Sequence, residues 1–173
     1  LCLVFPEGNK YCVFFKLYLN EFEVSKPEND HYRRYQQQNE LIVTEGNVTD
    51  FSVIRKDLEA IAEKFNIREI PYDPYFAMYF ATSLAESGLP MIEMSQTARN
   101  ISPVITEIEN LILEGRIEHE GNSMVEWMMS NVVVRESKFS GLKHATKERK
   151  ANKIDGPIAM LMALNRALAD ESD

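Results

Sequence analysis

Two aspartates occur where their side chains could act in catalysis. Asp73 lies in the segment Ile-Pro-Tyr-Asp-Pro, and Asp155 lies in Lys-Ile-Asp-Gly-Pro. Hard divalent cations need oxygen ligands, and Mg²⁺ is usually held by one or two carboxylates together with water and phosphate. Two carboxylates at neighbouring strand and helix ends could hold one cation, and a third would help to hold a pair. Two cations about 3.5–4 Å apart activate water and stabilise the leaving oxygen in phosphodiester hydrolysis.

The same two residues also have a purely structural interpretation. An Asp just before a helix commonly caps it, because its carboxylate accepts a backbone N–H, and Pro is favoured at the first helical position. For an isolated Asp-Pro pair we favour the cap over a catalytic role by roughly ten to one. A catalytic role for Asp73 and Asp155 therefore depends on folding that brings both carboxylates to one cation.

A basic stretch leads directly into Asp155. Residues 143–153 contain one acid, Glu148, and five basic residues: Lys143, Lys147, Arg149, Lys150 and Lys153. The stretch carries +4 in a chain whose net charge is −8, so basic charge is focused here and does not coat the protein. A run of charges is usually a solvated loop. Cations immediately before a candidate metal ligand are nevertheless well placed to hold a polyanion over it, and we predict that these five bind DNA.

Other chemistries have less support in the sequence. His31, His119 and His144 have no His or Cys partner at metal-ligand spacing, so a zinc site is not expected. No P-loop, Gly-rich dinucleotide turn or nucleophile elbow occurs, so ATP hydrolysis by the P-loop route is not expected. The Met residues of the later helices are interpreted as core filling.

The two cysteines do not indicate a disulfide framework. If residues 6–10 turn the chain into a hairpin, Cys2 should lie opposite Phe15 and Cys12 opposite Phe5, which places the thiols poorly for a bridge. We interpret them as buried thiols in a reducing cytoplasm.

The composition is that of an ordinary globular protein, with 45% hydrophobic and 27% charged residues in 173. We expect one domain over residues 1–173. No apolar run approaches the roughly 20 residues that a membrane span needs. Residues 1–5 lack the features of a signal peptide and are typical of a strand entered partway, so we expect the chain to begin inside its domain.

The order of the predicted elements points to a mixed α/β fold. Residues 20–40 are expected to be a loop with one short helix. The strands predicted at 67–73 and 91–94 are joined by one helix, which suggests a parallel crossover. Asp73 then lies at the carboxyl end of its strand, where ligands gather in such sheets. We predict strands at 1–5, 11–19, 41–44, 67–72, 91–94 and 131–134, and helices near 32–38, 51–65, 74–87, 103–114, 124–129 and from 155 onward. Asp50 is expected to cap the helix near 51–65, and Gly88 to end the next one. The helix near 103–114 is expected to start at Ser102-Pro103 and to stop at Gly115.

Nearly the whole chain resembles the nuclease domain of tailed-phage large terminases. The resembling segments, in order, are Gly46–Asp50, Ile70–Pro74, Leu111–His119, Trp127 with Ser130–Val134, and Lys153–Gly156 followed by an Ala-rich helix through Arg166. The resemblance implies an RNase H-like fold, a central mixed β-sheet flanked by helices, with a β-hairpin near the active site. It also implies cutting of concatemeric duplex viral DNA, with little sequence preference, by two divalent cations, Mg²⁺ or Mn²⁺.

Carried over by motif, Asp73 resembles the catalytic acid of the second strand and Asp155 that of the final helix. The basic segment before Asp155 resembles the hairpin beside the active site. The family's first acid lies on a central strand that precedes the hairpin at residue 1, so we expect a chain that is incomplete at its N-terminus. The implied partners are double-stranded DNA, the terminase ATPase domain, the small terminase subunit and the portal, in the cytoplasm of an infected or lysogenic bacterial host.

Two other functions fit the same residues. One is another RNase H-like nuclease, such as a junction resolvase or recombinase, which would prefer branched DNA. The other is a catalytically silent DNA- or partner-binding module of the packaging motor, which would bind DNA without cutting it. Tyr75 and Tyr79 are candidates for a partner surface, although core packing would explain them equally well.

Overall fold

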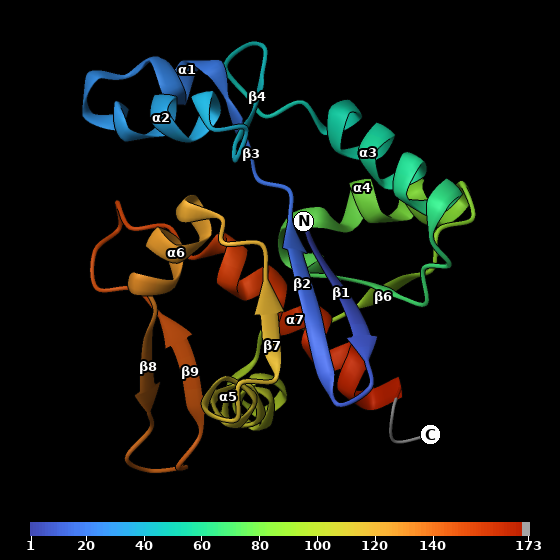
Figure 1. Ribbon diagram of the computed structural model, residues 1–173, viewed down its shortest axis with the longest axis vertical. Helices are drawn as coiled ribbons and strands as arrows, with labels where there is room; N and C mark the ends of the chain where they lie inside the picture. Colours follow the sequence, from blue (N-terminus) through green and yellow to red (C-terminus); the bar gives the residue numbers. More distant parts are fainter. Residues whose placement is uncertain (171–173) are drawn as a thin grey trace. The chain divides into compact units, whose positions relative to one another are not determined.

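The computed structural model describes residues 1–170 (Figure 1). Backbone contacts divide the chain into two compact units. Unit 1 contains Leu1–Phe15 together with the chain from Glu93 onward, and unit 2 contains Lys16–Ile92. Each unit is described by itself below, and the single domain expected over residues 1–173 stays a prediction.

The first sheet of unit 1 is built on the predicted N-terminal hairpin. β1 and β2 are antiparallel, with Cys2 opposite Phe15 and Cys12 opposite Phe5, so the predicted register is confirmed. The predicted strand 11–19 is wrong in its second half, because β2 ends at Phe15 and residues 18–20 form a separate strand. A third strand, not expected from the sequence, pairs parallel to β2. The sheet order is β1-β2-β7, with β1 (Cys2–Glu7), β2 (Lys10–Phe15) and β7 (Ile117–His119).

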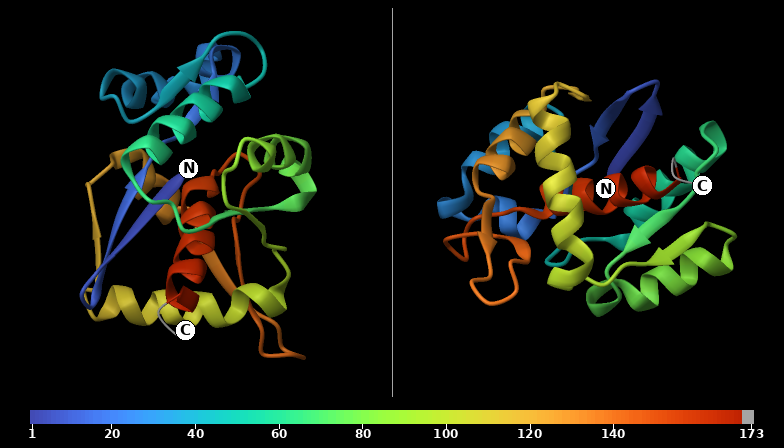
Figure 2. Two further views of the ribbon diagram at one scale, coloured as in Figure 1. Left: turned by 90° about the vertical axis from the view of Figure 1, so that its right-hand side faces the viewer. Right: turned by 90° about the horizontal axis from the view of Figure 1, so that it is seen from below.

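Three helices and a second hairpin complete unit 1. α7 packs against β1, α5 and α6 (Figures 1 and 2). Alternate residues of β2 are buried, which gives the sheet one apolar face. Met124, Met128, Met160 and Met162 are buried as well, which confirms these four as core filling, whereas Met129, predicted with them, is only half-buried. The elements are α5 (Ala98–Leu113), α6 (Ser123–Ser130), β8 (Val133–Glu136), β9 (Lys143–Thr146) and α7 (Asp155–Asp170).

The predicted start of α5 at Ser102-Pro103 is wrong. The helix begins at Ala98, after Thr97, and Pro103 lies inside it. Pro has no N–H, so it cannot donate a hydrogen bond to the carbonyl one turn earlier. The missing bond lies near the N-terminus of α5, and the later turns of the helix still form their hydrogen bonds. Ser102 does not cap the helix, because its Oγ accepts the backbone N–H of Lys143 at 2.9 Å. The end of α5 is as predicted, with Gly115 at φ +65°.

Unit 2 alternates short strands with helices. β3 and β4 pair in parallel, and β5 pairs with β6. Gly88, at φ +88°, ends the helix between β5 and β6 as predicted. The strand predicted at 67–72 is shorter, starting at Ile70. The elements are β3 (Tyr18–Asn20), α1 (Glu21–Ser25), η1 (Pro27–Asn29), α2 (His31–Gln37), β4 (Ile42–Thr44), α3 (Phe51–Lys64), β5 (Ile70–Tyr72), α4 (Pro74–Glu86) and β6 (Met91–Glu93).

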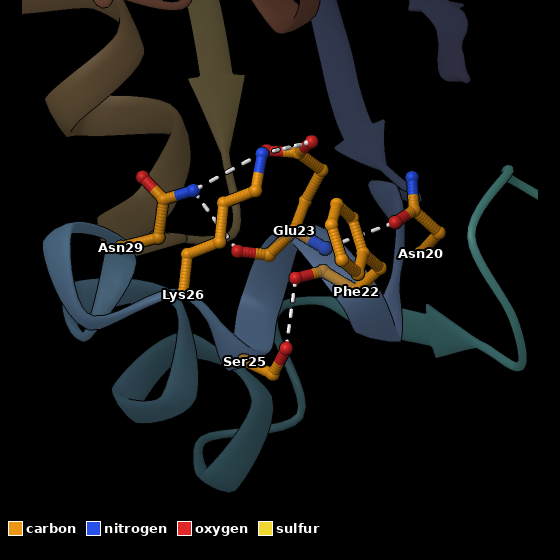
Figure 3. A network of polar contacts seen from close by, with 6 residues as sticks. All are labelled: Asn20, Phe22, Glu23, Ser25, Lys26 and Asn29. Carbon is orange, nitrogen blue, oxygen red and sulfur yellow. Dashed lines mark hydrogen bonds and ion pairs between the residues drawn. The ribbon is translucent and has the colours of Figure 1, made fainter.

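The segment predicted as a loop over residues 20–40 contains more helix than expected. The helix near 32–38 is confirmed as α2, but α1 and η1 precede it. Polar contacts hold α1 (Figure 3). Asn20 Oδ1 accepts the N–H of Glu23 at 3.0 Å, Lys26 Nζ lies 2.6 Å from Glu23 Oε1, and Asn29 Nδ2 donates to the Glu23 carbonyl at 2.9 Å. Because α1 is held by these local side-chain hydrogen bonds, its sequence has little apolar periodicity from which a helix could be predicted.

An aspartate of α3 ties that helix to the first strand of unit 2. Tyr18 Oη donates to Asp57 Oδ2 at 2.6 Å, and Lys16 Nζ lies 2.7 Å from Asp57 Oδ1. Burial raises the pKa of Tyr18, and the hydrogen bond to Asp57 adds to the rise. Partial burial alone would raise the pKa of Asp57, but the hydrogen bonds from Lys16 and Tyr18 outweigh it and lower the pKa below 3.8.

We predict that Asp57→Asn lowers the free energy of unfolding at pH 7 by about 1 kcal/mol, because a partly exposed charged hydrogen bond is lost. The folded-state pKa of Asp57 is below its unfolded value, so this stabilisation is present above about pH 4 and is lost as the pH falls through the folded pKa. Urea unfolding at pH 7 and pH 3 should therefore show a difference between variant and parent that shrinks at pH 3. The exposed Glu63→Gln on the same helix is the control, and a difference for Asp57→Asn that stays constant with pH contradicts the prediction.

Candidate active site

Asp73 lies at the carboxyl end of β5 and caps α4. Its Oδ1 accepts the backbone N–H of Tyr75 at 3.0 Å, and Pro74 occupies the first turn of the helix. The structural interpretation of this residue is therefore confirmed. Within residues 1–170 the other oxygen, Oδ2, accepts no hydrogen bond, so the cap holds the carboxylate in place while leaving one oxygen for a ligand. Capping and metal binding are compatible at this residue.

The tyrosines next to Asp73 do not pack in a core. Tyr75 is 83% exposed and Tyr79 is 91% exposed. Core packing is therefore the wrong interpretation of these two side chains, and the partner surface stays a prediction.

Asp155 is the first residue of α7, in unit 1, and its side chain is exposed. Gly156 and Pro157, which follow it, are buried. The backbone at the helix start is thus packed inward while the Asp155 carboxylate faces outward, without a hydrogen bond to any residue in 1–170. A negative side chain at a helix N-terminus is also favoured by the helix dipole.

Two side chains near α6 hold the backbone on both sides of Asp155. Asn131 Nδ2 donates to the carbonyl of Lys153 at 3.1 Å. The N–H of Gly156 lies 3.4 Å from Met128 Sδ, which accepts it. The sequence analysis assigned Asn131 only to a strand and Met128 only to the core. No sequence signal links Asn131 to Lys153, because the two residues are 22 positions apart and meet only through packing of α6 against the start of α7.

The five predicted DNA-binding residues fall into two groups. Lys143 lies in β9, and its Nζ is 2.5 Å from Glu109 Oε2 of α5. Its charge is thus already neutralised by an acid, which weakens its prediction as a phosphate ligand. The other four lie in the loop between β9 and α7 and form no ion pair with the part of the chain up to Asp170: Lys147, Arg149, Lys150 and Lys153. Arg149 and Lys150 are exposed and Lys147 and Lys153 are half-buried, so this loop retains its positive charge.

The hairpin expected over the basic segment is displaced toward the N-terminus. The antiparallel pair is β8 with β9, in which Val133 lies opposite Thr146 and Glu136 opposite Lys143. Of the five basic residues predicted to bind DNA, only Lys143 belongs to a strand. The other four lie in residues 147–153, which we call the basic loop. A run of β-branched residues, Val132–Val134, predicted the first strand, but nothing in Lys-His-Ala-Thr distinguishes the second from a loop.

The donor types fit the expected cations, because Asp73 Oδ2 and the Asp155 carboxylate are hard oxygen donors, as Mg²⁺ and Mn²⁺ prefer. Among residues 1–170 no group of three or more His, Cys, Asp or Glu side chains is arranged to hold a metal ion. Asp73 belongs to unit 2 and Asp155 to unit 1, so a cation shared by the two stays a prediction.

The remaining titratable candidates are histidines and cysteines. His119 Nδ1 accepts the N–H of Gly121 at 3.2 Å, and His144 is exposed. Cys2 and Cys12 are both free and half-buried, so they do not bridge, and burial raises the pKa of Cys2 to about 12. Cys2 is therefore protonated at neutral pH and a poor nucleophile. None of the helices within residues 1–170 is both long and apolar enough to cross a membrane.

Residues 10–171 match the family model described as "Terminase large subunit, endonuclease domain". The chain belongs to this family. It is 29% identical to Protein YmfN of Escherichia coli (strain K12) over 165 residues, which cover 92% of this chain and 36% of that protein. It is 25% identical to the large terminase subunit of Enterobacteria phage HK97 over 147 residues, 84% of this chain and 29% of that protein. The chain thus spans about a third of the length of these two relatives.

Solved structures of terminases share the fold. The crystal structure of the HK97 bacteriophage large terminase superposes with a TM-score of 0.83 at 22% identity, covering 95% of this chain and 36% of that chain. The large terminase nuclease from thermophilic phage G20c superposes with a TM-score of 0.57 at 14% identity, covering 70% and 64% of the respective chains. The predicted fold class is confirmed: this terminase nuclease family member has a mixed α/β, RNase H-like fold, with sheet and flanking helices.

Proposed function

We propose that this chain is the metal-dependent endonuclease that cuts concatemeric duplex viral DNA during genome packaging. The observation that carries the proposal is the match of residues 10–171 to the terminase endonuclease domain. That span contains both Asp73 and Asp155, and the structure leaves an oxygen of each without a hydrogen bond from residues 1–170.

Asp73 and Asp155 would hold Mg²⁺ or Mn²⁺, and the family resemblance implies a further acid that completes the set for two cations. When bound, such cations supply an activated water and stabilise the leaving oxygen of the phosphodiester. The chain itself contributes orientation. The cap hydrogen bond from Tyr75 N–H holds the Asp73 carboxylate, and the bonds from Asn131 and to Met128 hold the backbone around Asp155. A carboxylate held in position spends less free energy on ordering when a ligand binds.

The basic loop, residues 147–153, would hold the DNA backbone beside Asp155. Its four side chains without ion pairs can contact phosphates, which positions a duplex without reading its sequence. Such contacts suit an enzyme with little sequence preference. Lys143 is better placed to position β9 on α5, since it already pairs with Glu109.

The partners of such a nuclease would be those of a packaging motor: the terminase ATPase domain, the small terminase subunit and the portal. These follow from the family, and the chain spans only about a third of its curated relatives. The proposed location is the cytoplasm of an infected or lysogenic bacterial host.

The test is cutting of supercoiled plasmid by the full-length protein. With Mg²⁺ or Mn²⁺ we expect conversion to nicked and then linear DNA. A chelator should stop the reaction, and restored metal should resume it. Equal cutting with and without the chelator would refute the metal-dependent mechanism. Strong preference for a four-way junction over linear duplex would favour a junction resolvase, and DNA binding without any cutting would favour a silent binding module.

A further inference from the structure

The β8–β9 hairpin carries a fully exposed phenylalanine at its tip. The hairpin turn lies at the end of the strands away from α6 (Figures 1 and 2). Phe139 occupies this turn with a relative exposure of 103%, and the exposed Lys138 precedes it. Nothing in residues 1–170 covers the ring.

The turn is ordered, so the ring is held outward by the backbone. Ser137 N–H donates to the Leu142 carbonyl at 3.0 Å, and Gly141 N–H donates to the Ser137 carbonyl at 2.8 Å. Ser137 Oγ also accepts the N–H of Ser140 at 3.3 Å, and Gly141 takes a φ of +67° that suits glycine. A ring presented by a turn with this many internal hydrogen bonds loses little conformational entropy when it contacts a partner.

The hairpin is fastened to α5 at the turn end of its strands, because Lys143 lies opposite Glu136 in the last pair before the turn. The backbone N–H of Lys143 donates to Ser102 Oγ at 2.9 Å, and Lys143 Nζ pairs with Glu109. Four residues of strand and half of the turn extend about 20 Å at roughly 3.3 Å per residue. Phe139 thus lies in the turn just beyond the α5 contact, about that distance from the base of the hairpin, where Val133 lies opposite Thr146.

Charge indicates the kind of partner. Residues 135–153 contain seven basic side chains and two acids, in a chain of net charge −8. Arg135 and Lys138 are exposed and form no ion pair with residues 1–170, and the four free cations of the basic loop follow directly after β9. Positive charge without an ion pair therefore lies both near the tip and in the segment before Asp155. An apolar tip flanked by cations is complementary to nucleic acid, which combines a polyanionic backbone with stacked apolar bases.

We propose that Phe139 is an apolar wedge that contacts the bases of duplex DNA, with Lys138 on the neighbouring phosphate. This is a second DNA contact, separate from the cutting site. This inference rests on the proposed function, in which duplex DNA is the substrate. Phe side chains of DNA-binding proteins are inserted between base steps from the minor groove. A hairpin about 20 Å long from its base to its turn would place this contact about six base pairs from the basic loop, at about 3.4 Å per pair.

The test measures binding of the full-length protein to a fluorescent duplex in the presence of a chelator. Fluorescence anisotropy gives the binding constant K at each of a series of salt concentrations. Phe139→Ala should weaken binding about tenfold, in line with the loss of one aromatic–base contact. It should leave the slope of log K against log salt unchanged, because Phe releases no counterions. Lys138→Ala should reduce that slope by about one. Phe139→Trp should restore affinity, since it restores an aromatic ring.

Leu113→Ala is the matched control, because Leu113 is also in unit 1 and is 85% exposed but lies outside the hairpin. It should bind DNA like the parent protein. A duplex with 2-aminopurine near the contact should brighten with the parent and stay quenched with Phe139→Ala. Parent-like affinity of Phe139→Ala, or an equal loss in Leu113→Ala, overturns the wedge. So does a defect of Phe139→Ala in binding a packaging protein with no defect on DNA. None of these outcomes depends on metal or cutting, so failure here is distinguishable from failure of the nuclease assignment.

Discussion

Asp155→Asn should slow metal-supported cutting of plasmid DNA by more than about 100-fold. Groups that only orient a metal ligand typically contribute 10- to 100-fold, so loss of a ligand's charge should exceed that range. The substitution keeps the shape of the side chain, and the Asp155 carboxylate is exposed and forms no hydrogen bond with residues 1–170, so the fold should tolerate it. The measurement is the initial rate of nicking at saturating Mn²⁺, with circular dichroism to check folding.

The control for Asp155→Asn is Glu148→Gln. Glu148 is also an exposed acid, and it lies within the basic loop. Removing either negative charge should leave duplex binding equal or slightly tighter, because repulsion from the phosphates falls. Only Asp155→Asn should lose cutting. Undiminished cutting by Asp155→Asn, or equal losses in both variants, would show that Asp155 is not a metal ligand.

Asp73→Asn should reduce cutting by a similar factor, more than about 100-fold, and here the chain offers a closely matched control. Asp73 Oδ1 accepts the N–H of Tyr75 at 3.0 Å, and Asp50 Oδ1 accepts the N–H of Ser52 at 2.8 Å. Both residues cap a helix of unit 2 through the same kind of bond. Asn caps helices about as well as Asp, so both substitutions should leave the unfolding midpoint nearly unchanged. Asp50→Asn should therefore cut DNA at the parent rate.

The comparison of Asp73→Asn with Asp50→Asn separates capping from catalysis. A loss of cutting confined to Asp73→Asn supports metal binding through Oδ2. Full activity in Asp73→Asn would assign Asp73 to the helix cap alone, which is the interpretation favoured for any isolated Asp-Pro pair. Similar losses in both variants would indicate that cutting responds to the stability of unit 2, and the metal assignment of Asp73 would then fail.

Features that depend on neighbours in sequence were predictable. The turn over residues 6–10 between two apolar segments predicted the hairpin and its register, with Cys2 opposite Phe15. The caps at Asp50 and Asp73 and the positive φ of Gly88 followed from the same local chemistry. Local signals failed where a residue has two possible uses. Pro103 was assigned to a helix start, but α5 contains it in its interior.

The sequence by itself determined the type of the longer elements, the two candidate carboxylates and the focus of positive charge before Asp155. Only the tertiary structure decided which partners these residues have. The parallel pairing of β7 with β2, the ion pair of Lys143 with Glu109 and the bond from Asn131 to Lys153 join residues 22 or more positions apart. Periodicity and capping report the conformation of a segment over a few residues. Long-range contacts depend on which surfaces pack together, and that packing gives Lys143 a partner while leaving the basic loop and Phe139 exposed.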